Sequence, residues 1–581
     1  MLEKRKSDDF KRRLFFGRKA AAHPVRRNPL FPRAQGLLGR PACEAARLRI
    51  QYGGNLYPWN LHEPQEGVFE WEDEKDFAAF ALLAQRLGLH VILRPSPYIC
   101  AEWEMDGLPW WLLKKPGLRL RCMNRTYLAA VDRYFDELIP RLAPLQVTHG
   151  RPVLMMQIEN EYGSYGNDHE YLRYLAEGMK RRGVDVPLFT SDGGERCMLS
   201  AGTLPEYFKT VNFGSCAEKN FQILREYQPE GPLMCTEFWN GWFSRWNEKP
   251  ELPEVEVVAQ RFRECLSAGG NVSVYMFHGG STFGWMNGAS HEMGYQPIVT
   301  SYDYGALLTE AGDYTEKYRL FRHALTGLDD LKNLPPEQPK TRYGRIPFIG
   351  GADLLACRDL LAAPLHDAAP LPMEALDQGY GFTLYHTHVN GPREEKNLWI
   401  ERPHDRALIF VNGMFRAVQY RNDSRSPLAL SVPKEGLELD VLVENMGRVN
   451  YGERIDDIKG VTRGVRLGGA WLFHWDMWPL TMENLSVIPF QKNIPAFCGR
   501  PLLLRAELTV RGAPGDSFLK LPGFVRGVAF VNGRCLGRYW NVGPQQSLYL
   551  PGPWLADGTN EILILELEGC GQPELLLDDK P

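Results

Sequence analysis

Val153-Leu-Met-Met-Gln-Ile-Glu-Asn-Glu161 begins as an apolar run and ends in acidic and amide side chains. A short apolar run of this kind is typical of a buried strand. Pro232-Leu-Met-Cys-Thr-Glu237 repeats the arrangement, and aromatic residues follow each segment. Glycoside hydrolysis needs two carboxylates at neighbouring strand ends, because one protonates the leaving oxygen while the other attacks the anomeric carbon or directs water to it. The two segments therefore predict a parallel sheet with a sugar-cleaving site at its edge.

Helical and strand patterns alternate from residue 73 to about residue 321. An apolar stripe at helical spacing runs from Phe77 to Leu87, and Gly88 supplies a C-terminal stop. Repeated strand–helix units in this number favour a closed (β/α)8 TIM barrel over an open sheet. The strand candidates are residues 90–95, 153–159, 187–191, 210–214, 232–236 and 271–277, and the helix candidates include residues 170–182 and 254–268.

The pattern changes after the stiff linker Leu334-Pro-Pro-Glu-Gln-Pro339, where short strands alternate with Gly, Pro and Asp turns. This pattern is typical of β-sandwiches. Phe410-Val-Asn-Gly413 and Phe530-Val-Asn-Gly533 both join an apolar strand to a tight Asn-Gly turn, which indicates two such domains. We therefore expect a barrel over 57–330, a linker over 331–345, a first β-sandwich over 346–485 and a second over 486–581.

Composition narrows the functional classes. The chain has 581 residues, a net charge of −4, and 44% hydrophobic and 24% charged residues, so nucleic acid and anionic membranes are not expected as partners. No apolar run reaches the length of a membrane span, and no hydrophobic signal core follows Met1. The 11 cysteines show no metal-like spacing, and His62 and His278 lack a metal-motif partner, so no metal or cofactor is expected. Reduced thiols indicate a cytoplasmic protein.

Several segments resemble the signature segments of the family 35 glycoside hydrolases, the β-galactosidases. The resemblance runs in order from about Tyr57 to the C-terminus. It implies a (β/α)8 TIM barrel followed by two all-β jelly-roll or sandwich domains, in an enzyme of the bacterial intracellular type. The segments are Gln157-Ile-Glu-Asn-Glu-Tyr-Gly163, Glu237-Phe-Trp-Asn-Gly-Trp242, Pro97-Tyr-Ile-Cys-Ala-Glu-Trp103, Pro58-Trp-Asn-Leu-His-Glu-Pro64 and Thr300-Ser-Tyr-Asp-Tyr304.

The resemblance also implies roles for individual residues. Glu161 would be the general acid/base and Glu237 the nucleophile of a retaining mechanism, in which the two carboxyl groups lie about 5–5.5 Å apart. Glu102 and the backbone of its two predecessors would bind galactose hydroxyls, and Asn160 the 2-hydroxyl. The remaining substrate-site candidates are Cys100 and Ala101 through their backbone, Trp239, Trp242 and Trp285 for stacking, Tyr304 beside the nucleophile, Tyr57, and Tyr451 on a β-domain turn over the barrel mouth.

The resemblance implies a retaining exo-β-galactosidase acting on a small galactoside or oligosaccharide. Two alternatives stay open: another exo-β-glycosidase of the same fold, or a sugar-binding or inactive protein. Each candidate also has a structural reading, such as an ion-paired glutamate or a core tryptophan. A homodimer is considered, although no residue pattern specifies the oligomeric state.

The N-terminal segment departs from the family. Members begin with a strand and helix resembling FxLDGKPxRILSGAIHYFR, whereas Leu14 to Leu56 shows no such pattern. Suitable codons for residues 14–56, read one base later, do encode it: Asn28-Pro-Leu-Phe-Pro-Arg33 becomes IHYFR. We interpret residues 1–56 as an aberrant segment containing a compensated frameshift. It replaces the first strand and helix and should leave a gap in the barrel, since an unpaired strand edge exposes backbone groups.

Overall fold

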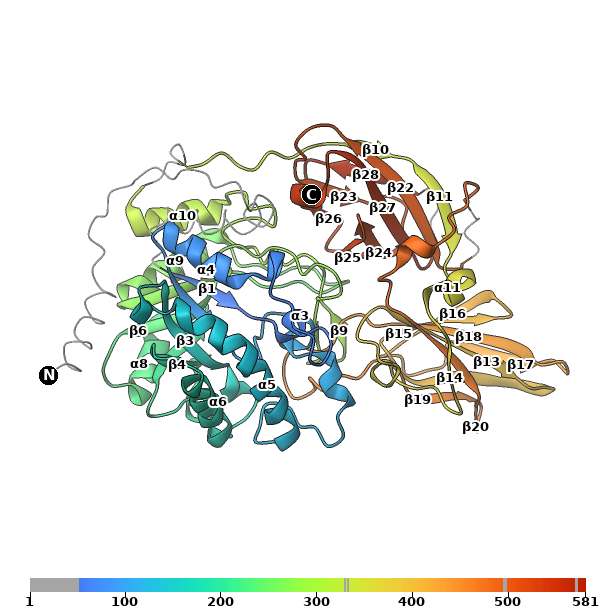
Figure 1. The fold of residues 1–581 in the computed structure, drawn as a ribbon, viewed down its shortest axis with the longest axis horizontal. Helices are drawn as coiled ribbons and strands as arrows, with labels where there is room; N and C mark the ends of the chain where they lie inside the picture. Colours follow the sequence, from blue (N-terminus) through green and yellow to red (C-terminus); the bar gives the residue numbers. More distant parts are fainter. Residues whose placement is uncertain (1–51, 329–330, 332–333, 495–498, 570–572) are drawn as a thin grey trace.

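A computed structural model of the protein describes residues 52–328, 331, 334–494, 499–569 and 573–581 (Figure 1). In the described residues, one parallel sheet of seven strands forms a TIM-barrel-like domain, in the order β1-β2-β3-β4-β5-β6-β7. The strands are β1 (Tyr52–Leu56), β2 (His90–Arg94), β3 (Val153–Asn160), β4 (Leu188–Gly193), β5 (Phe208–Phe213), β6 (Leu233–Trp239) and β7 (Gly270–Tyr275).

The two ends of this sheet order are β1 and β7, which pair with β2 and β6 but not with each other in the described part of the chain. The prediction that residues 14–56 contribute no barrel strand is wrong for Tyr52–Leu56, which pair in parallel with β2. The reason is that a strand ladder uses main-chain groups, so a segment of unrelated sequence can occupy it. The rest of the predicted out-of-frame segment lies outside the described residues.

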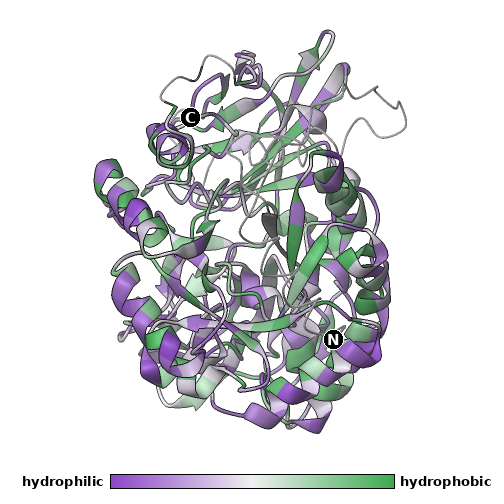
Figure 2. Ribbon diagram, turned by 90° about the vertical axis from the view of Figure 1, so that its left-hand side faces the viewer, coloured by the Kyte–Doolittle hydropathy of each residue, from purple (hydrophilic) through white to green (hydrophobic). Residues whose placement is uncertain are grey.

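Helices cover the outside of the sheet, with polar faces toward solvent and apolar strands inside (Figure 2). Several begin at side-chain caps: Asp76, Asn124 and Asp168 each accept a hydrogen bond from a backbone N–H three residues later. No helix in the described ranges is long and apolar enough to cross a membrane. The helices are α3 (Trp59–His62), α4 (Phe77–Arg86), α5 (Arg125–Leu142), α6 (His169–Arg181), α7 (Arg196–Gly202), α8 (Ala217–Tyr227), α9 (Val255–Ser267) and α10 (Glu316–Thr326).

The barrel elements predicted from periodicity are confirmed. The stripe from Phe77 forms α4, and Gly88 follows it in the left-handed conformation. The predicted helices over 170–182 and 254–268 correspond to α6 and α9, and each strand candidate overlaps one of β2 to β7. Element type is therefore set by local pattern, while most ends differ from the prediction by one to three residues.

The first all-β domain packs a six-stranded sheet, β12-β21-β13-β18-β15-β16, on a four-stranded one, β17-β14-β19-β20. Tyr385, Ile409 and other inward-facing side chains form its core, while Leu384 and Leu408 belong to a cluster shared with the second all-β domain. Its strands are β12 (Leu365–Asp367), β13 (Phe382–Val389), β14 (Arg393–His404), β15 (Arg406–Val411), β16 (Met414–Tyr420), β17 (Leu428–Val432), β18 (Leu437–Glu444), β19 (Gly460–Leu467), β20 (Ala470–Trp471) and β21 (Trp475–Leu480).

The second all-β domain is discontinuous in sequence, which corrects the predicted boundary at residue 346. Its sheets are β10-β28-β23-β26 and β11-β22-β27-β24-β25, so β10 and β11 belong to it although they precede the first all-β domain. Long-range pairing of this kind leaves no local sequence signal. Its strands are β10 (Gly344–Ile346), β11 (Phe348–Asp353), β22 (Leu502–Val510), β23 (Ser517–Lys520), β24 (Arg526–Val531), β25 (Arg534–Trp540), β26 (Ser547–Leu550), β27 (Gly558–Glu566) and β28 (Leu575–Asp578).

Both predicted Asn-Gly hairpins are confirmed. Asn412 and Gly413 join β15 to β16, and Asn532 and Gly533 join β24 to β25. All four residues have positive φ, between 50° and 75°. Positive φ at both central positions is what a type I′ turn requires, and Asn-Gly tolerates it with little strain.

Candidate active site

The two catalytic candidates come from strands β3 and β6, which run parallel in the same sheet. Glu161 directly follows β3, and its backbone N–H donates to the carbonyl of Ser191 at the matching end of β4. Glu237 lies near the end of β6, next to Asn212 of β5 in the strand register. Functional groups at the carboxyl ends of barrel strands are where TIM-barrel enzymes place their active sites.

Glu161 lies in a polar, half-buried environment. Its Oε1 accepts a 2.9 Å hydrogen bond from Nδ2 of Asn212, and its Oε2 lies 3.7 Å from Sγ of Cys100. Burial and the negative charge of Glu237 raise the pKa of Glu161 to about 7, against the lowering effect of Asn212. The carboxyl group of Glu161 therefore holds its proton up to near-neutral pH.

Glu237 is held instead by a cation. Arg94, at the end of β2, donates through Nη2 to Oε1 of Glu237, and Nε1 of Trp239 donates to Oε2 at 3.2 Å. Both charged side chains are more than nine-tenths buried. The two neighbouring carboxyl groups therefore have different surroundings: Glu237 is in a salt bridge with a guanidinium, whereas Glu161 accepts from an amide and has a raised pKa. A difference of this kind between two carboxyl groups is typical of a nucleophile and an acid.

Asn160 shares a hydrogen-bond donor with Glu237, because Nη2 of Arg94 donates to both side chains. Its Oδ1 accepts from Nη2 of Arg94 and from Nε2 of Gln157 at 2.8 Å, while its buried Nδ2 has no hydrogen-bond partner among the described residues. A buried polar group without a partner costs free energy. Nδ2 of Asn160 is therefore a donor available to a ligand hydroxyl.

Glu102 and its loop form another wall of the site. Glu102 accepts a hydrogen bond from the hydroxyl of Tyr302, which also lies 3.0 Å from the hydroxyl of Tyr275. Burial raises the pKa of Glu102 to about 8 against that hydrogen bond, and the charges of Glu237 and Glu161 add to the increase. Cys100 and Glu102 both have positive φ, so this loop is bent tightly.

A loop of the first all-β domain reaches this part of the barrel. The hydroxyl of Tyr98 donates to the carbonyl of Asn450 at 3.1 Å, and Val449 forms a β-bridge with Ala289 of the barrel. Tyr451 lies close enough to Ser164 to hydrogen-bond with it, and burial together with the charge of Glu161 raises the pKa of Tyr451 to about 12. The predicted approach of Tyr451 to the barrel mouth therefore has support in these contacts.

Comparison with known proteins identifies the family. Residues 55–328 match the model of glycosyl hydrolases family 35, residues 370–481 match the beta-galactosidase first all-beta domain, and residues 501–560 match the beta-galactosidase galactose-binding domain. The chain is 39% identical over 546 residues to the beta-galactosidase-1-like protein of Mus musculus, covering 90% of this chain and 83% of that one. It is 38% identical over 545 residues to the beta-galactosidase-1-like protein 2 of Homo sapiens, with 90% and 83% covered. The beta-galactosidase of Canis lupus familiaris is 38% identical over 550 residues, with 88% and 81% covered.

The chain belongs to glycosyl hydrolase family 35. Its barrel match begins at Asn55, inside β1, so the segment predicted to be out of frame lies almost entirely before the family match. The relatives named above are mammalian, which gives no support to the expected bacterial intracellular type.

Two of the expected substrate-site residues of this family 35 enzyme, Trp285 and Tyr304, lie in surroundings that the sequence did not indicate. Trp285 is only 9% exposed and packs edge-on against Phe382 and Phe530, so it belongs to the core shared with the all-β domains rather than to a sugar-stacking surface. Among the described contacts, Tyr304 makes no hydrogen bond to Glu237, which is held by Arg94 and Trp239. The ring of Tyr304 packs instead against Tyr275 and Tyr302 beside the site.

The other aromatic candidates differ in exposure. Trp239 donates to Glu237 through its indole nitrogen, and the ring of Trp242, which is 44% exposed, meets the ring of Trp239 edge-on. Tyr57 is buried with its ring against Phe77, in the main barrel core. His62 is also buried, with a pKa lowered to about 4 by burial, and it contacts the carbonyl of Glu70.

Sequence reasoning missed Arg94, Asn212 and Tyr302. Arg94 is the last residue of β2, and Asn212 is the last but one of β5. Their position could have identified them, since polar groups at the ends of barrel strands line the active site. The structure also separates the two glutamates of the β3 motif: Glu159 makes a bidentate pair with Arg121 at 2.9 Å, both buried, and is structural. Among the described residues, no cluster of His, Cys, Asp and Glu is arranged to hold a metal.

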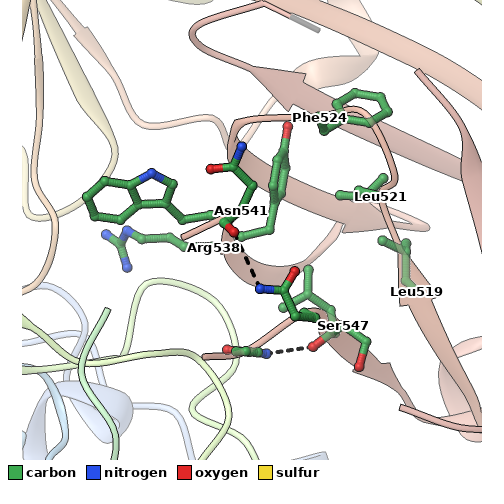
Figure 3. A pocket seen from close by; sticks show the side chains of 11 residues that line it. Leu519, Leu521, Phe524, Arg538, Asn541 and Ser547 are labelled. Atoms are coloured by element: carbon green, nitrogen blue, oxygen red, sulfur yellow. Dashed lines mark hydrogen bonds between the residues drawn. The ribbon is translucent and has the colours of Figure 1, made fainter. Parts of the chain in front are cut away.

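A pocket lies in the second all-β domain (Figure 3). Its wall is apolar at Leu519, Leu521 and Phe524, and amide groups of Gln545 and Gln546 are tied back to nearby carbonyls at 2.8 and 3.4 Å. None of the described residues that line it is a carboxylate, whereas Glu161 and Glu237 lie at strand ends of the barrel.

Arg448 should be essential for joining the first all-β domain to the barrel. Its guanidinium is fully buried and donates at 2.6 Å to Glu104 of the barrel and at 2.6 Å to Glu374. Arg448→Met should lower the free energy of unfolding by about 3–5 kcal/mol, because two carboxylates would be left buried and unpaired. Denaturant unfolding measures this, and Arg454→Met on the same loop, where the side chain is exposed, should change stability by less than about 0.5 kcal/mol. Equal losses in the two variants would contradict the assignment.

Proposed function

We propose that this family 35 enzyme is a retaining exo-β-galactosidase that releases terminal non-reducing β-D-galactosyl residues through a covalent galactosyl-enzyme intermediate. The observation that carries the proposal is the contrast between the carboxyl groups. Arg94 forms a buried salt bridge with Glu237, while burial and the charge of Glu237 raise the pKa of Glu161 to about 7. One group is thus prepared to attack and the other to donate a proton.

The reaction follows from this difference between the two carboxyl groups. A carboxylate oxygen of Glu237 bonds to the anomeric carbon as the glycosidic C–O bond breaks, and the leaving oxygen takes the proton of Glu161. Glu161, now a carboxylate, then removes a proton from water. The resulting oxygen nucleophile attacks the anomeric carbon and releases Glu237, so two inversions give net retention. Nδ2 of Asn160 is available for the sugar 2-hydroxyl, an interaction that strengthens in the transition state.

Glu102 supports galactose over other sugars. A site built to bind a particular hydroxyl rejects the epimer that lacks it there, because its polar groups would be left unpaired. A panel of aryl β-galactoside, β-glucoside and β-glucosaminide tests the substrate, and NMR of the first sugar formed tests retention. We expect the highest kcat/KM for the galactoside and the β-anomer as first product. A higher kcat/KM for another glycoside would establish the alternative exo-β-glycosidase, and the α-anomer would refute retention.

Glu161→Gln should affect substrates according to their leaving group. The kcat/KM for an alkyl galactoside should fall by about 10²–10⁴-fold, since general acid catalysis is lost. A dinitrophenyl galactoside, whose leaving group needs no proton, should lose much less in the first step. Azide should restore its turnover by attacking the anomeric carbon without a base. The matched Glu237→Gln variant should gain nothing from azide, and a loss independent of the leaving group would contradict the role of Glu161.

For location, we infer a reducing compartment, the cytoplasm. The support is that the eight cysteines in the described ranges are all free thiols. The same argument is the basis for an intracellular rather than a secreted type. Cell fractionation tests the inference, and recovery in a secreted fraction would refute it. The homodimer stays a prediction, to be measured by analytical ultracentrifugation.

A further inference from the structure

A chain of buried hydroxyl groups ends on the amide that holds the acid/base. Thr210 and Thr236 lie with their hydroxyl oxygens 2.6 Å apart, and Thr236 is 2.6 Å from the hydroxyl of Ser191. The Ser191 hydroxyl donates to Oδ1 of Asn212 at 2.8 Å, and Nδ2 of Asn212 donates to Oε1 of Glu161 at 2.9 Å. The first four side chains come from β4, β5 and β6, and all are buried.

Thr236 Oγ1 also lies 3.1 Å from Oδ1 of Asn212, and Thr210 Oγ1 lies 3.1 Å from the carbonyl oxygen of Thr190. A set of proton positions that runs in one direction satisfies the contacts between the hydroxyl groups and the Asn212 amide. Thr210 donates to Thr236, Thr236 to Ser191, and Ser191 to the amide oxygen of Asn212, which uses one proton from each hydroxyl. Hydrogen bonds aligned in this way strengthen one another in a low-dielectric interior. They also fix which end of the Asn212 amide faces Glu161, because a reversed amide would place its carbonyl oxygen against the carboxylate.

The orientation of the amide distinguishes the two oxygens of Glu161. Oε1 receives the N–H of Asn212 and is therefore an acceptor in both protonation states. The proton of the neutral acid then resides on Oε2, the oxygen that accepts from Sγ of Cys100 at 3.7 Å when the carboxyl group is ionised; Cys100 lies on the loop that also carries Glu102. Oε2 is thus the oxygen directed toward the sugar-binding loop.

We propose that Asn212 is a positioning residue for the acid/base, that it holds Glu161 by Oε1 so that Oε2 carries the transferred proton, and that the hydroxyl chain of Thr210, Thr236 and Ser191 fixes its amide. The inference rests on the proposed function in that Glu161 is taken as the proton donor. Asn212 acts through Glu161 and does not itself touch the reacting bond.

The hydrogen bond from Asn212 to Glu161 has a measurable consequence for the pH dependence of kcat/KM. A donated hydrogen bond favours the ionised carboxylate, so its loss should raise the pKa of Glu161. The high-pH limb of kcat/KM, which reports loss of the acid's proton in the free enzyme, should move upward. For Asn212→Leu we expect an upward shift of about one pH unit, the size expected for loss of a hydrogen bond to a charged group. Turnover of a dinitrophenyl galactoside below that pH should also fall, because the base form is scarcer.

The chain offers a matched pair of variants that keep Asn212. Thr236→Val removes a hydroxyl of the chain and should shift the limb upward by less than Asn212→Leu. Thr190→Val removes a neighbouring buried hydroxyl that has no hydrogen-bond partner in the described part of the chain, and it should leave the limb where it is. Both changes preserve shape, so they stay informative if Asn212→Leu does not fold.

The experiment is a pH profile of kcat/KM for this chain and the three variants. In parallel, carbon-13 NMR of the glutamate carboxyl groups gives the titration of Glu161, assigned by difference from Glu161→Gln. An upward shift in Asn212→Leu and Thr236→Val but not in Thr190→Val supports the proposal. Superimposable titrations, or a Thr190→Val shift as large as that of Thr236→Val, overturn it. If the chain hydrolyses no galactoside, the proposed function fails, while the NMR titration still decides whether Asn212 controls Glu161.

Discussion

Glu237→Gln should abolish the hydrolysis of an aryl β-galactoside, with kcat lowered by roughly 10³-fold or more. The amide is uncharged and a poor nucleophile, so the galactosyl-enzyme ester cannot form. Arg94 would also lose its salt-bridge partner while it stays buried. The exchange therefore changes the local electrostatics as well as the chemical step. Steady-state kinetics of the unmodified chain and of Glu237→Gln measure the loss of kcat, and thermal unfolding shows whether the variant keeps the fold.

Glu248→Gln provides the matched control for this exchange. Glu248 follows β6 in the same region, but its side chain is 42% exposed in a surface pair with Arg245, so its loss should leave kcat unchanged. In the unmodified chain, a 2-fluoro-galactosyl inhibitor should add one sugar to the peptide that contains Glu237. Retention of more than about a tenth of the wild-type kcat by Glu237→Gln, or labelling of a different carboxylate, would contradict the assignment.

Restoring the reading frame of residues 14–56 should raise kcat/KM by about 100-fold or more. In the described sheet β1 and β7 approach each other but form no hydrogen-bonded ladder, and a barrel closes only when each edge is paired. An unclosed barrel would leave the strand ends that carry Arg94, Glu161 and Glu237 less firmly placed. Misplacement by about 1 Å costs on the order of 10²-fold in rate. Parallel assays of the chain as it stands and of the frame-restored chain test this.

A control chain carries residues 14–56 with the same composition in scrambled order. It shows whether a gain in activity needs the restored sequence or only a segment of that length. The nucleotide sequence across codons 10–60 gives a direct check of the frameshift. Equal activity and equal Tm in the original and frame-restored chains would refute it. Calorimetry with galactose addresses the remaining alternative, since binding by the original chain without turnover would make it a sugar-binding protein.

The sequence alone determined the elements and the two catalytic candidates. Apolar runs that end in Glu161 and Glu237 specify buried strands, and helical spacing from Phe77 specifies α4, because these signals are local. The Asn-Gly turns were predictable for the same reason, since positive φ at both central positions restricts the choice of residues. The alternating order of these elements was enough to predict a barrel followed by sandwiches.

The tertiary structure decided which side chains meet. Arg94 and Glu237 are 143 residues apart in the chain, and Asn212 and Glu161 are 51 apart, so neither contact has a local signature. Trp285 could be assigned to the core only when the all-β domains packed on it. The same holds for β10 and β11, whose partners lie beyond the inserted first all-β domain. Backbone pattern is set by neighbours in sequence, whereas protonation state, burial and strand partnership depend on groups that folding brings together from distant parts of the chain.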